Sequence, residues 1–160
     1  KDIFVIVLAY LTDMESRTKL VLFGIAVSYF WFSWYSTKVE NSKMPQVPGC
    51  MTVYTVKQEG SGETVEKGNT VTVHATGVVK ESSYKFWSTK DPGQKPFQFQ
   101  AGVGSVIKGW DMGCLGMKKG EIRALEIPFD EGYGAGGFPA WKIPPHATLQ
   151  FEIEILDIQK

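Results

Sequence analysis

The sequence contains an uncharged run of eighteen residues, LVLFGIAVSYFWFSWYST, between Lys19 and Lys38. Its composition is that of a membrane-spanning segment and differs from that of the residues that follow it. As a helix the run would be roughly 27 Å long, at about 1.5 Å per residue. This length nearly matches the ~30 Å hydrocarbon core of a bilayer. Aromatic residues gather toward its C-terminal end, as they do in interfacial belts. We therefore expect one membrane-spanning helix at about residues 19–37, within an N-terminal part of residues 1–43.

Three other interpretations of this run compete with a membrane anchor. A buried core helix is disfavoured because the run has no polar face, and a secretory signal peptide because the apolar region is long and no small-residue cleavage pattern follows it. A helix held by a partner subunit is hard to separate from an anchor. The apolar segment Ile3–Leu11 is too short to span a membrane and suits an interfacial position or packing against another membrane protein. Charges of both signs lie on both sides of the run, so its orientation is not predicted.

From residue 44 onward the pattern changes to short strands separated by turn residues. In ATLQFEIEI (147–155) apolar residues alternate with polar ones, which predicts a strand with one buried face. TVTVHATG (70–77) alternates in the same way. Residues 44–160 therefore predict a second domain of the α+β class, with about five antiparallel strands packed on one short helix.

The stretch FQFQAGVGSVIKGW (97–110) is expected to form the centre of this domain. A short strand would point Phe97 and Phe99 to one side. A glycine turn follows, and Ser105 is expected to cap a helix that begins at Val106. That helix would carry on one face Val106, Ile107 and Trp110. The aromatic rings and the indole would then meet, either as an ordinary core or as the floor of a binding site.

A second candidate for recognition is the glycine- and proline-rich segment at residues 129–145. It cannot form a regular helix or strand, yet it carries four large apolar side chains, Tyr133, Phe138, Trp141 and Ile143. Large side chains on such a loop are typical of recognition surfaces.

Charge and cysteine content narrow the possible partners. The chain has 17 basic and 17 acidic residues, so a nucleic-acid partner is not expected. Cys50 and Cys114 are the only cysteines and lie far apart, so no metal site is predicted, and no cofactor motif is present. A disulfide between them stays open, although Cys114 lies in an apolar helix and fits a small buried hydrophobe better.

Three motifs occur in order: KPFQF (95–99), VIKGWDMGCLGMKKGE (106–121) and YGAGGFPAWKIPPHATLQFEIEIL (133–156). Together they resemble the FKBP-type peptidyl-prolyl cis-trans isomerases (rotamases), over roughly residues 50–159. The resemblance implies a five-stranded antiparallel half-barrel wrapped around one short helix, an isomerase that acts on X-Pro bonds during protein folding, and no cofactor. The predicted N-terminal anchor lies outside the region of resemblance.

The resemblance also assigns roles to individual residues. Trp110 resembles the indole on which the proline ring rests, and Tyr133 and the Ile107 N–H resemble the donors to the ligand carbonyls. Phe86 resembles a further residue of the catalytic group. The substrate-binding residues implied are Phe97, Val106, Ile143, Phe151 and Trp87, together with Phe138 and Trp141 on the loop rim.

Two positions depart from the family pattern: Ala75 replaces a usual tyrosine, and Trp87 replaces a usual aspartate. These changes remove a polar pair and predict reduced affinity for macrolides. We therefore expect a membrane-anchored prolyl isomerase that acts on proline-containing protein segments, in an organellar membrane or the endoplasmic reticulum. The alternative is a weakly active or inactive docking subunit of a larger membrane complex.

Overall fold

The computed structural model describes residues 44–160, and six strands and one α-helix make up the regular structure of this part. The strands are β1 (Val53–Gln58), β2 (Thr70–Val79), β3 (Tyr84–Ser88), β4 (Phe97–Gln100), β5 (Ile122–Ile127) and β6 (Leu149–Gln159), and the helix is α3 (Lys108–Gly113). Three 3-10 turns follow β5: η1 (Phe129–Glu131), η2 (Gly134–Gly136) and η3 (Pro139–Trp141).

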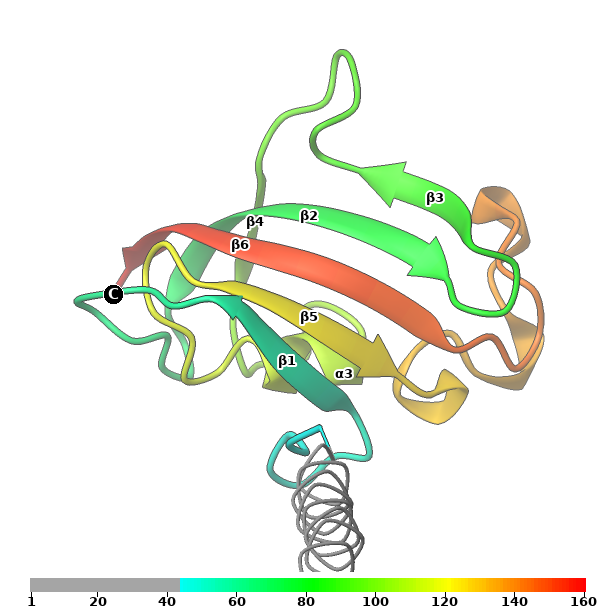
Figure 1. The fold of residues 1–160 in the computed structure, drawn as a ribbon, viewed down its shortest axis with the longest axis horizontal. Coiled ribbons are helices and arrows are strands. Elements are labelled where there is room, and N and C mark those ends of the chain that lie inside the picture. Colours follow the sequence, from blue (N-terminus) through cyan, green and yellow to red (C-terminus); the bar gives the residue numbers. More distant parts are fainter. Residues whose placement is uncertain (1–43) are drawn as a thin grey trace, which may run out of the picture. The chain divides into compact units, whose positions relative to one another are not determined.

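All six strands form one antiparallel sheet in the order β1-β5-β6-β2-β3, and β4 also pairs with β2 (Figure 1). The sheet therefore has one strand more than predicted. The reason is the length of β2, since one half of its free edge pairs with β4 and the other half with β3. The antiparallel sheet on one short helix agrees with the predicted α+β class.

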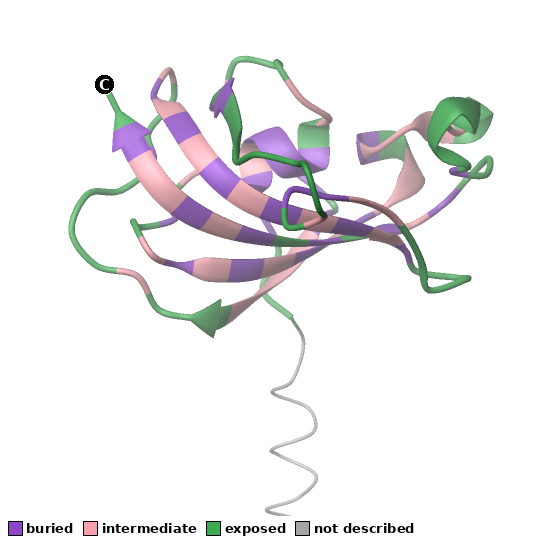
Figure 2. Ribbon diagram, turned by 90° about the horizontal axis from the view of Figure 1, so that it is seen from above, coloured by how far each residue is buried: buried purple, intermediate pink, exposed green. Residues whose placement is uncertain are grey.

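The alternation in the sequence correctly predicted which side chains of β2 and β6 face inward. Buried and less buried residues alternate as bands along both strands (Figure 2). In β6 the buried positions run from Leu149 to Ile155 in steps of two, and then shift to Ile158. The shift follows from a bulge, because β6 has one extra residue opposite the Thr72–Val73 step of β2.

Helix α3 lies close against one face of the sheet (Figure 1). Two glycines permit this approach: a Cβ on Gly109 would lie 2.5 Å from Thr52 Oγ1, and one on Gly113 would lie 2.6 Å from a methyl group of Leu125. The helix begins at Lys108, so the predicted start at Val106 is wrong. Ser105 is not its cap, because the Ser105 hydroxyl instead donates to the Gln100 carbonyl (2.7 Å).

The two cysteines are both buried and unpaired, which leaves the disulfide alternative without support. Cys114 is completely buried in the core, as expected for a small hydrophobe. Among residues 44–160 there is no helix long and apolar enough to cross a membrane. The predicted spanning helix at about 19–37 and the segment Ile3–Leu11 lie outside the described residues.

Candidate active site

A hollow of about 820 Å³ opens between α3, the strands β3 and β4, and the turns that follow β5. Its walls are mostly apolar and aromatic, as is usual for ligand sites. The residues that line it are Trp87, Gly93, Gln94, Lys95, Pro96, Phe97, Gly104, Ser105, Val106, Ile107, Trp110, Tyr133, Trp141 and Phe151.

The floor of the hollow is the indole of Trp110, which is only 5% exposed. Its ring centroid lies 4.7 Å from that of Phe151 and 6.0 Å from that of Phe97. The tilted and edge-on orientations are those favoured between aromatic rings. The buried indole N–H has no well-aligned acceptor among the described residues.

One wall consists of two parallel indoles from distant parts of the chain. Trp87 on β3 and Trp141 on η3 stack with their planes 3° apart and their centroids 6.2 Å apart. Trp87 also approaches Trp110 at 6.0 Å, so the wall continues into the floor. Trp87 thus extends the apolar surface of the hollow.

Two of the residues that line the hollow, Ile107 and Tyr133, carry hydrogen-bond donors. Within residues 44–160 neither the Ile107 N–H nor the Tyr133 hydroxyl has a hydrogen-bond partner. Ile107 directly precedes the first residue of α3 (φ −56°, ψ 145°), and an N–H at this position has no acceptor within the helix. Burial raises the pKa of Tyr133, so its hydroxyl stays protonated and able to donate at neutral pH.

Eight of the eleven predicted site residues line the hollow, and the other three, Phe86, Phe138 and Ile143, do not. Phe86 lies edge-on to Phe151 (5.6 Å between centroids) and stacks on Trp141 (6.0 Å). Phe138 stacks on Tyr133 (5.2 Å), and its backbone pairs with that of the buried Ile143. Phe86 and Phe138 therefore contact residues that line the hollow, and Ile143 adjoins Phe138.

The segment Gly93–Pro96 was not predicted to belong to the site. Its position directly before the aromatic strand β4 was an available signal. Ala75 is buried and does not line the hollow. Its backbone N–H and carbonyl instead bond the hydroxyl of Thr89.

Comparisons with known proteins identify the family of this chain. The family model described as "FKBP-type peptidyl-prolyl cis-trans isomerase" matches residues 61–156. The chain is 57% identical over 106 residues to the peptidyl-prolyl cis-trans isomerase FKBP12 of Arabidopsis thaliana. The aligned region covers 65% of this chain and 95% of that protein. The chain is 58% identical over 102 residues to the FKBP12 of Vicia faba (62% and 91%), and 52% identical over 101 residues to an FK506-binding protein of Neisseria meningitidis serogroup B (63% and 90%). The chain therefore belongs to the family of FKBP-type peptidyl-prolyl cis-trans isomerases, and it is a prolyl isomerase.

Proposed function

We propose that the aromatic hollow is the isomerase site and that it binds proline-containing segments of proteins. The observation that carries this proposal is the presence of two free donors, the Ile107 N–H and the Tyr133 hydroxyl, at a floor formed by the Trp110 indole. The proline ring rests on the indole, and the donors bond carbonyl groups on either side of the X-Pro bond.

These parts are sufficient to accelerate rotation without a nucleophile or a base. The planar amide is stabilised by resonance, and rotation about it faces a barrier of ~18–20 kcal/mol. The twisted amide has lost this resonance and separates less charge, so a hollow lined mainly by apolar groups favours it over the planar form. Donors that hold the flanking carbonyls in the twisted geometry stabilise the transition state selectively. Each ~1.4 kcal/mol gained in this way gives about a tenfold higher rate.

The parallel indoles of Trp87 and Trp141 suggest which substrates are preferred. Their wall adds a flat apolar surface next to the floor, and Trp141 is 39% exposed at its outer edge. We infer a preference for a large apolar residue before the proline. Trp87 stands where the family usually has an aspartate, so a polar group is missing from this wall. We infer from this a reduced affinity for macrolides.

The test is cis/trans exchange of a Phe-Pro peptide, measured by NMR line shape or by a protease-coupled assay. Trp110→Leu keeps an apolar side chain in the core and removes the indole floor, so catalysis and peptide binding should both be lost. Tyr84→Ala is the control, because Tyr84 is an exposed aromatic residue on β3 that does not line the hollow. Unchanged catalysis in folded Trp110→Leu would refute the site. Peptide binding without acceleration in the unmodified chain would indicate the docking role instead.

We also propose that the chain is anchored in a membrane by the uncharged run at about residues 19–37, in an organellar membrane or the endoplasmic reticulum. The support is the length of the run and its aromatic end. The full chain should stay in the membrane pellet after an alkaline carbonate wash, and a fragment of residues 44–160 should not. Release of the full chain would refute the anchor. After detergent extraction, a free enzyme would migrate alone and a docking subunit would migrate with a large complex.

A further inference from the structure

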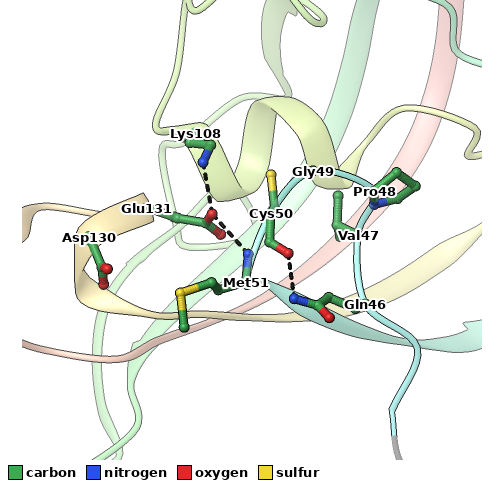
Figure 3. Close-up of a pocket in the computed structure, with 9 residues that line it drawn as sticks. All are labelled: Gln46, Val47, Pro48, Gly49, Cys50, Met51, Lys108, Asp130 and Glu131. Atoms are coloured by element: carbon green, nitrogen blue, oxygen red, sulfur yellow. Dashed lines mark hydrogen bonds and ion pairs between the residues drawn. The ribbon is translucent and has the colours of Figure 1, made fainter.

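A second hollow, of about 630 Å³, lies where three segments of the chain meet (Figure 3). The first segment is the N-terminal loop, residues 44–52, which leads into β1. The second is the start of α3 at Lys108, and the third is the turn η1, which contributes Asp130 and Glu131. Neither Asp130 nor Glu131 belongs to the aromatic hollow.

The carboxylate of Glu131 joins these three segments. Glu131 is 5% exposed, and each of its two carboxylate oxygens accepts two hydrogen bonds. Oε1 accepts from the Met51 N–H (2.9 Å) and from Lys108 Nζ (3.0 Å), and Figure 3 shows both donors directed at it. Oε2 accepts from the N–H (2.9 Å) and the hydroxyl (2.7 Å) of Thr52. A buried carboxylate with four donors is a rigid link rather than a solvent-exposed surface pair.

The two residues that supply the free donors of the aromatic hollow adjoin this link. Ile107 directly precedes Lys108, which Glu131 holds through the ammonium group. Tyr133 follows Glu131 by two residues, across the end of η1 at Gly132. The distance between the Ile107 N–H and the Tyr133 hydroxyl therefore depends on how α3 and η1 are held together.

We propose that Glu131 is a positioning residue for the isomerase reaction. Its hydrogen bonds set the separation of the Ile107 and Tyr133 donors and make this separation depend on the N-terminal loop, through Met51 and Thr52. This inference rests on the proposed function of the aromatic hollow. Hydrogen-bond donors stabilise a twisted amide only at the correct separation, and a displacement of about 1 Å can lower a rate up to ~10²-fold. Trp110 and Glu131 line different hollows, and no hydrogen bond of Glu131 involves Trp110, so binding of the proline ring should change much less than the rate.

The experiment uses the full chain in mild detergent and measures kcat and KM separately on a Phe-Pro peptide. Glu131→Gln keeps the size of the side chain but removes the charge. Two milder variants act on its partners: Lys108→Gln removes the ammonium group, and Thr52→Val removes the hydroxyl. The matched control is Lys119→Gln, because Lys119 is paired with Asp157 at 2.8 Å and is exposed to the same extent as Lys108, 54% against 55%.

We expect kcat to fall roughly tenfold in Glu131→Gln and about threefold in each milder variant, with KM within about twofold of the parent. The amide NMR signals of Ile107 and Tyr133 should shift together in all three variants, and Lys119→Gln should match the parent in every measurement. A role confined to stability would lower activity only in proportion to the unfolded fraction.

Unchanged kcat in folded Glu131→Gln would overturn the proposal. If that variant does not fold, unchanged kcat in both Lys108→Gln and Thr52→Val would do the same. If the aromatic hollow is not the isomerase site, the result would be different: isomerase activity would survive in Trp110→Leu. Loss of activity in Trp110→Leu with no effect of the Glu131 series would refute the positioning role alone.

Discussion

Glu131 should also make the stability of the domain depend on acid. Burial alone would raise the pKa of this carboxyl, but hydrogen bonds from the Thr52 hydroxyl, the Met51 N–H and Lys108 outweigh burial and lower the pKa from 4.5 to about 2. A carboxyl with a lowered pKa in the folded state stabilises that state above its unfolded pKa. This stabilisation is lost as the pH falls from about 4.5 toward 2.

The size of the effect follows from the two pKa values. At ~1.4 kcal/mol for each pH unit, the difference between 4.5 and about 2 corresponds to about 3 kcal/mol of unfolding free energy at neutral pH. At pH 3 the unfolded carboxyl is almost fully protonated and the folded one is still mostly ionised, so about 2 kcal/mol of this contribution is already lost. Glu131→Gln lacks the ionisable group and should not show this loss.

The assay is urea unfolding of residues 44–160 at pH 7, 5 and 3. This fragment is suitable because the matched region makes up 95% and 91% of the two plant relatives, so the fold exists without an N-terminal extension. The stability difference between the parent and Glu131→Gln should shrink by about 2 kcal/mol between pH 7 and pH 3. Asp157→Asn is the control, since this carboxyl is exposed and its ion pair is screened by solvent. A difference that stays constant from pH 7 to pH 3 would refute the reasoning.

Three further predictions concern the core. Gly109→Ala should lower the free energy of unfolding by about 1–3 kcal/mol in urea titrations, because the added Cβ would overlap Ile127 on the sheet. Arg123→Met should lower it by about 3–5 kcal/mol, because Glu121, 5% exposed and bonded to Arg123 at 2.7 Å, would be left as a buried unpaired charge. Cys114 should react with a thiol reagent at pH 8 only after unfolding, because it is fully buried and burial raises its pKa; reaction in the native state would contradict this.

The candidate site was predicted in part from sequence because its aromatic residues are close together along the chain. Phe97, Ile107 and Trp110 lie within one stretch of fourteen residues, and all three line the hollow. The resemblance to a family added the residues on other strands and on the loop. Phe86, however, does not line the hollow, and its ring contacts Trp141 and Phe151, which do.

The sequence by itself determined the class of fold and the inward faces of the strands. Alternation of apolar and polar residues is a property of near neighbours, so β2 and β6 could be read directly from it. The glycine turn before α3 was also visible. The start of the helix was not, because the Ser105 hydroxyl bonds the end of β4 instead of capping the helix.

Only the tertiary structure decided which distant side chains meet. Glu131 bonds Met51 and Thr52, which lie 80 and 79 residues away in the chain, and Trp87 on β3 stacks on Trp141 on η3. No local pattern contains these pairs, because they form only when the sheet closes on α3 and brings the N-terminal loop, the helix and η1 together. Burial then strengthens the contacts of Glu131, because within a low-dielectric interior a hydrogen-bonded charge has no water with which to exchange its partners.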